Sequence, residues 1–146
     1  MQKWSYLTWL AKQAADGLRW AWPVTVVLTF LLLAAAVWSR RRISALFRAP
    51  ALWQLVPLGV APALLALGTW FACQNCSPSS LGQGHRYMWA MRACDALLVA
   101  QLVGAALLVK AASPLRLLAA SFQLLLLWCS YWAAFMAGMS MSGDWL

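Results

Sequence analysis

Four apolar stretches of this chain each come close to the length of a bilayer crossing, and together they take up most of its 146 residues. They cover residues 20–38, 52–72, 88–109 and 117–137. A helix needs about 20 residues to cross about 30 Å of hydrocarbon. The sequence therefore predicts an all-α integral membrane protein with four transmembrane helices in a bundle.

The composition favours the same class, because hydrophobic residues make up 64% of the chain and charged residues 10%. A water-soluble chain of this kind would expose large apolar patches, whereas lipid covers them. We expect one domain over residues 20–137 and a short tail over residues 138–146. We also expect no cleaved signal peptide, since the first apolar stretch is longer than the 7 to 15 residues typical of a signal-peptide core.

Residues 1–19 predict an amphipathic helix that lies along the membrane surface. Apolar side chains recur at helical spacing and polar side chains fall on the other side. The apolar set is Trp4, Leu7, Ala11, Ala14 and Leu18, and the polar set is Thr8, Lys12, Asp16 and Arg19. This helix should turn into the first crossing near Pro23, because proline is tolerated in the first helical turn. The same pattern would also suit docking on a partner protein.

The second apolar stretch contains residues that interrupt a helix. Pro57 and Pro62 lie in it, together with Gly59 and Gly68. Proline removes a backbone donor and clashes with the preceding turn, so the helical hydrogen bonds should be broken at least once. We expect a bend in this crossing.

The net charge of +8 comes from basic residues that lie at the ends of the apolar stretches. They do not form a basic patch interleaved with aromatic residues, so no nucleic-acid partner is expected. Arg40, Arg41 and Arg42 lie in the first connection, and Lys110 and Arg116 flank the third. Cytoplasmic loops carry an excess of Lys and Arg. We expect N-out and C-out topology, in a bacterial inner membrane, with the arginine triplet against anionic lipid.

The third stretch contains Arg92 and Asp95, three residues apart. Charges facing lipid are unfavourable, so we expect the two side chains to pair and to be held in protein. A proton or cation carrier role for Asp95 is the alternative. A carrier needs relay partners, and only Gln101, Gln123 and Ser130 are available in the last two stretches.

Small residues at helical spacing predict close contact between helices in the last two stretches. These residues are Ala96, Ala100, Gly104, Ala134 and Gly138. Most of the eleven tryptophans fall near the ends of the apolar stretches and are typical of interfacial anchors. Trp128 and Trp132 instead lie inside the fourth stretch at i, i+4. We expect them to contact a partner subunit, with a lipid or small-molecule groove as alternatives.

Cys73 and Cys76 form a C-x-x-C pair after the second stretch. A disulfide is the expected state, and thiol exchange or half of a metal site are alternatives. In its size and this pair the chain resembles four-helix membrane thiol oxidases that use a quinone. Those proteins carry a second pair in a later loop, whereas Cys94 and Cys129 fall within apolar stretches. We therefore do not transfer their function, and the two remaining cysteines are expected to be small buried side chains.

Copper handling is a further alternative, because soft ligands near the outer ends of the third and fourth stretches suit Cu(I). The residues concerned are His85, Met88 and Met139. No cofactor or metal is otherwise expected. Methionine in an apolar helix usually serves only as a filler.

Groups for acid–base or nucleophilic catalysis are scarce, since the chain has one His and three acidic residues, all Asp. We expect a small non-catalytic subunit of a larger membrane complex that packs against partner helices and lipid. A homo-oligomeric sensor or channel is the first alternative. A thiol-redox or copper-handling protein that uses the Cys73 and Cys76 loop is the second.

Overall fold

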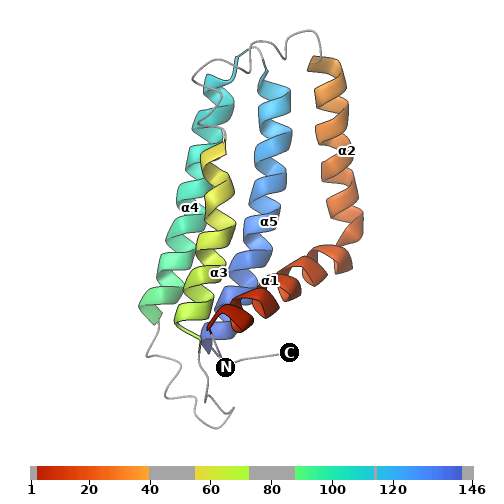
Figure 1. The fold of residues 1–146 in the computed structure, drawn as a ribbon. Helices are drawn as coiled ribbons and strands as arrows, with labels where there is room; N and C mark the ends of the chain where they lie inside the picture. The colour runs from red at the N-terminus through yellow and green to blue at the C-terminus, as the bar shows by residue number, and fades with distance from the viewer. Residues whose placement is uncertain (1–2, 40–54, 73–87, 114, 143–146) are drawn as a thin grey trace.

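The computed structural model describes residues 3–39, 55–72, 88–113 and 115–142. Within these ranges every regular element is a helix. The α-helices are α1 (Lys3–Trp20), α2 (Trp22–Ser39), α3 (Val60–Trp70), α4 (Met88–Ala111) and α5 (Arg116–Ser142). Figure 1 shows α2 and α4 running in one direction and α3 and α5 in the other, with α1 crossing one end of the assembly.

Three of these helices, α2, α4 and α5, are long and apolar enough to cross a membrane, as an integral membrane protein requires. The second predicted stretch forms a shorter apolar helix, Leu55–Trp70. It begins with a 3₁₀ segment at residues 55–59, which contains Pro57, and continues as α3. The expected break in the helical ladder therefore falls at its start. Pro62 lies in the first turn of α3, where an intrahelical donor is not needed.

The turn between α1 and α2 falls at Ala21, two residues before Pro23. The Ala21 N–H donates to the Gly17 carbonyl oxygen at 3.0 Å, which closes the last turn of α1. α1 turns Leu10, Ala14 and Gly17 toward the other helices, whereas Lys12 and Arg19 are exposed. The apolar set predicted for this helix shares only Ala14 with the observed buried face. The buried face is selected by neighbouring helices, since Leu10 lies close to Gly68 of α3 and Gly17 lies under Trp132 of α5, and the hydropathy of α1 alone does not record these contacts.

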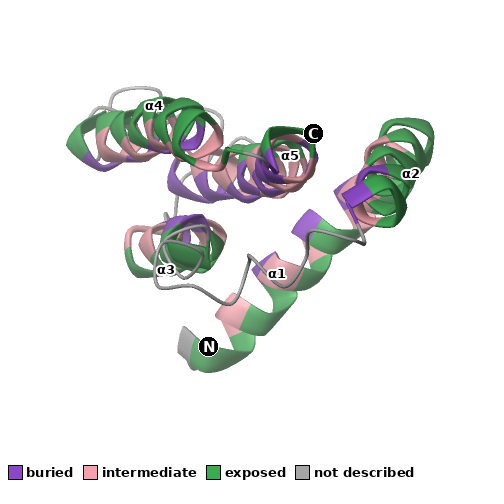
Figure 2. Ribbon diagram, turned by 90° about the horizontal axis from the view of Figure 1, so that it is seen from above, coloured by how far each residue is buried: buried purple, intermediate pink, exposed green. Residues whose placement is uncertain are grey.

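Helix α5 packs against each of the other four helices, while α2 contacts only α1 and α5 among the described helices. Seen from above in Figure 2, α2 stands apart from α3 and α4. The buried residues of α5 recur at alternating spacings of four and three, which is the spacing of one packed helix face. They include Ala119, Gln123, Leu126, Ser130, Ala133, Ala137 and Ser140.

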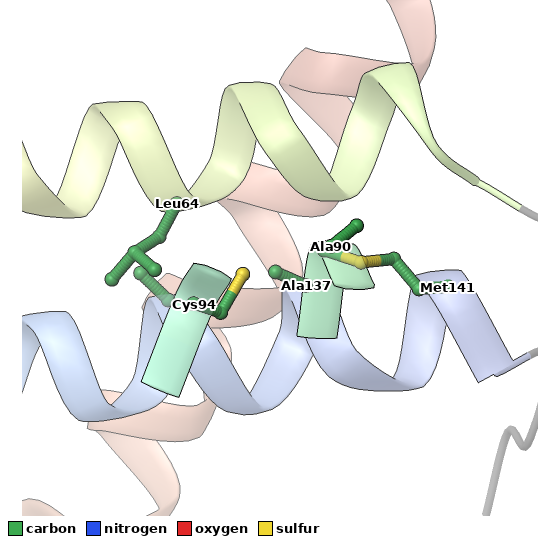
Figure 3. Packing of buried hydrophobic residues seen from close by; sticks show 6 residues of the cluster. Leu64, Ala90, Cys94, Ala137 and Met141 are labelled. Atoms are coloured by element: carbon green, nitrogen blue, oxygen red, sulfur yellow. The ribbon is translucent and has the colours of Figure 1, made fainter. Parts of the chain in front are cut away.

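The main apolar core lies between α3, α4 and α5 (Figure 3). It contains Leu64, Ala90, Cys94, Ala133, Ala137 and Met141. Three of its six side chains are alanines, so these helix backbones approach one another closely. The burial of Cys94 in this cluster agrees with its expected role as a small apolar side chain.

Gly68 permits the contact between α3 and α5. A Cβ atom at Gly68 would lie 2.7 Å from the Cα of Ala137 and 3.2 Å from a methyl carbon of Leu10. At Gly104 and Gly138, in contrast, no described atom beyond the neighbouring residues and the local helix backbone lies within 4 Å of such a Cβ. Within the described residues no other helix makes the predicted close approach at these two glycines. Helix α5 also continues to Ser142, through residues expected to belong to a tail.

The substitution Gly68→Ala should destabilise the fold by about 1 to 3 kcal/mol, because the added methyl group meets backbone atoms of α5 that cannot rotate away. The measurement is unfolding in mixed SDS and mild-detergent micelles, followed by tryptophan fluorescence. Gly138→Ala is the control, since it makes the same helix-favouring change where space is open. Equal stability of the two variants would contradict the packing described for Gly68.

Candidate functional site

A hydrogen-bond chain joins α1, α3 and α5 near the end of α5. The Ser140 hydroxyl is fully buried and donates to the Gly68 carbonyl oxygen at 2.9 Å. Its oxygen also lies 2.8 Å from the Tyr6 hydroxyl, which can therefore donate to it. Because Gly68 lacks a side chain, its backbone is open to this contact. This set of hydrogen bonds was not identified from the sequence, because an isolated serine near a helix end carries no distinctive signal.

The two tryptophans of α5 hold α1 and α2 in place. The Trp128 indole N–H donates to the Thr25 hydroxyl of α2 at 3.1 Å. That hydroxyl in turn donates to the Leu18 carbonyl oxygen at 3.1 Å. The Trp132 ring lies directly over Gly17 of α1, where any Cβ would clash with it. Both indoles were expected to contact a partner subunit, but the structure turns them toward helices of the same chain, because α1 and α2 pack on this face of α5.

Arg92 and Asp95 both lie on the exposed side of α4. Between side chains in the described ranges, the only ion pair is Asp16–Arg19 of α1, at 3.8 Å. The ion pair expected from the spacing of Arg92 and Asp95 is therefore not formed. No other described helix covers these two side chains, because the buried side of α4 carries a different set of residues. That set is Ala90, Cys94, Gln101 and Ala105.

The predicted small-residue stripe divides between the two sides of α4. Ala96 and Ala100 are exposed, next to Asp95, and Gly104 is half-buried. On α5, Ala134 is half-buried and packs against the apolar core. The Ala96 and Ala100 surface is therefore available to another molecule, whereas Ala134 serves the fold of this chain.

Polar side chains are also buried between the long helices. Gln101 of α4 and Ser130 of α5 are 3% and 1% exposed. Neither the amide of Gln101 nor the Ser130 hydroxyl has a hydrogen-bond partner among the described residues. Gln101 lies on the buried side of α4 and Asp95 on the exposed side, so the described residues do not form a continuous relay from Asp95.

Several predicted site residues lie outside the described ranges, namely Cys73, Cys76, His85 and the arginines Arg40, Arg41 and Arg42. The two methionines of the copper hypothesis are described. Met88 is exposed at the start of α4, and Met139 is half-buried near the end of α5. Within the described residues no group of three or more His, Cys, Asp or Glu side chains could hold a metal ion.

Comparison with models of known protein families, with curated proteins and with solved structures finds no match for this chain. The described residues alone therefore characterise the protein. They form helices, three of which are apolar and long enough to span a membrane, and two charged residues face outward from one of these three helices.

The hydrogen bond between Trp128 and Thr25 should show a coupling free energy of about 0.6 kcal/mol, the average for hydrogen bonds between transmembrane helices. The measurement is a double-mutant cycle with Trp128→Phe and Thr25→Val, using unfolding in mixed micelles. Thr25→Ser keeps the acceptor and should retain most of the coupling. Additive effects of Trp128→Phe and Thr25→Val would show that the bond does not hold α2.

Proposed function

We propose that this chain is an integral membrane protein with four crossings and works as a small non-catalytic subunit of a larger membrane assembly. The crossings are α2, the helix Leu55–Trp70, α4 and α5. The shorter helix counts as a crossing because α2 and α4 run in the same direction, so the chain must return between them (Figure 1). Exposed apolar side chains on α2, α4 and α5 suit contact with lipid or with partner helices.

Basic residues support the proposed orientation. Lys110 at the end of α4 and Arg116 at the start of α5 are both exposed, and they flank the same connection. With the four arginines of the first connection they place six of the eleven basic residues on one side of the protein and five toward the other, and this small excess favours the cytoplasm of a bacterial inner membrane. In this arrangement α1 lies at the outer surface, with Lys12 and Arg19 exposed. The arginine triplet would then meet anionic lipid head groups.

The observation that carries the subunit function is the outward position of Arg92 and Asp95 on α4. Charged residues in membrane helices almost always face protein or a water-filled cavity. In this chain they face away from α3 and α5 and have no ion-pair partner in the described ranges. A neighbouring protein that covers α4 would remove the cost of exposing them to lipid. The thiol-redox and copper alternatives stay predictions, because their main ligands lie outside the described residues.

The protein purified in mild detergent or in lipid nanodiscs should have a mass larger than one chain, because an isolated chain leaves Arg92 and Asp95 uncovered. Native mass spectrometry, which resolves the protein components after detergent removal, checks this. Additional chains in a fixed ratio are the expected result. A single chain in both environments would rule out the subunit function.

The proposed topology predicts that a reporter fused after Leu146 lies outside the cytoplasm. Alkaline phosphatase at this position should be active in a bacterial host, and green fluorescent protein should be dark. The control is the same pair of reporters fused within the connection between α4 and α5, where the pattern should reverse. Identical patterns at both positions would contradict four crossings with an outer C-terminus.

A further inference from the structure

The outward side of α4 carries two opposite charges that complement the same surface of another copy. We propose that two copies of this chain associate through this side, with Arg92 of each copy paired to Asp95 of the other about a two-fold axis along the membrane normal. This proposal rests on the membrane function proposed above and names the partner. We call the surface the α4 outer face, defined by Arg92, Asp95, Ala96, Val99 and Val103, all of them exposed.

Asp95 lies too deep for its side chain to reach the head groups. It follows Trp89 by six residues, which corresponds to about 9 Å along a helix. Trp89 is 57% exposed at the start of α4 and suits the interface between lipid and water. The long Arg92 side chain can extend toward that interface, but the short carboxylate side chain cannot. Asp95 therefore needs a partner at its own depth.

The chain itself does not supply this partner in the ranges that the structure describes. The side of α4 that packs on α3 and α5 contains Ala90 and Cys94, which belong to the apolar core. Arg92 and Asp95 point away from that core and are exposed. Figure 2 shows the outer side of α4 as exposed along much of its length. Because no described residue neutralises Asp95, we assign the neutralising group to a second molecule.

A second copy satisfies both charges at once. Under two-fold symmetry the same patch lies on both sides of the interface, so a pair between Arg92 of one copy and Asp95 of the other occurs twice. The three-residue separation places the paired groups about 4.5 Å apart along the helix axes, a distance that an arginine side chain spans. An anionic lipid would neutralise Arg92 only and would leave Asp95 uncovered.

The remaining residues of the α4 outer face suit helix pairing. Ala96, Val99 and Val103 follow spacings of three and four, which is the seam of a left-handed helix pair. Ala96 and Ala100 carry only methyl groups, so two such helices can approach closely next to the charges. The apolar valines then fill the rest of the contact.

The test uses two differently tagged full-length copies, produced together and purified in mild detergent, with association measured by co-purification and by mass. Wild-type copies should associate. Arg92→Asp alone and Asp95→Arg alone should each weaken self-association by about tenfold or more, because like charges then meet across the axis. Arg92→Asp mixed with Asp95→Arg should recover association, because every pair across the axis is again of opposite sign. The chain that carries both substitutions should also associate with itself.

The matched control is the pair Asp16 and Arg19 of α1, which has the same residue types and spacing. Arg19→Asp should leave association unchanged. Recovery by the doubly substituted chain but not by the mixed single variants would place the pair within one chain and overturn the proposal. Wild-type protein that contains other proteins but a single copy of this chain would overturn the proposal and leave the subunit function standing. A lone chain in detergent and in nanodiscs would overturn both.

Discussion

The close approach of α3 to α5 at Gly68 is the contact around which α1, α3 and α5 are arranged, and α2 and α4 pack on the α5 that it positions. Within a bilayer the hydrophobic effect does not drive helices together, so van der Waals packing and hydrogen bonds must hold them. Gly68 supplies both, since its missing side chain admits Ala137 and exposes a carbonyl oxygen to the Ser140 hydroxyl. Leu10 and Tyr6 then join α1 to the same junction. Three helices are thereby fixed around one glycine.

A second attachment holds α2, and its limited extent leaves α2 open to neighbours. The turn at Ala21 connects its first residues to α1, and the hydrogen bond from Trp128 to Thr25 connects them to α5. Beyond these turns the buried residues of α2 are Ala35 and Ser39. Exposed Phe30 and Val37 give the helix an apolar surface along its length. Such a surface is suited to lipid and needs no protein cover.

The outer side of α4 differs from that of α2 because it combines apolar residues with charge. Exposing a methyl or isopropyl group to lipid has no free-energy cost, whereas exposing an aspartate to lipid is unfavourable. The proposed pairing of Arg92 with Asp95 of a second copy gives this difference a structural role. The apolar surface would hold the protein in the membrane, and the charge pair would select the second copy as its binding partner.

The sequence alone determined the helices and predicted that prolines interrupt the second apolar stretch, because length, hydropathy and proline act locally along the chain. It did not determine which side of each helix packs inward. Helices that are apolar all round give no periodic signal, since lipid and protein both accept apolar side chains. Close contact was expected at Gly104 and Gly138, and among the described residues it occurs at Gly17 and Gly68. Only the tertiary structure could decide this, because a glycine permits close packing solely where another helix crosses it.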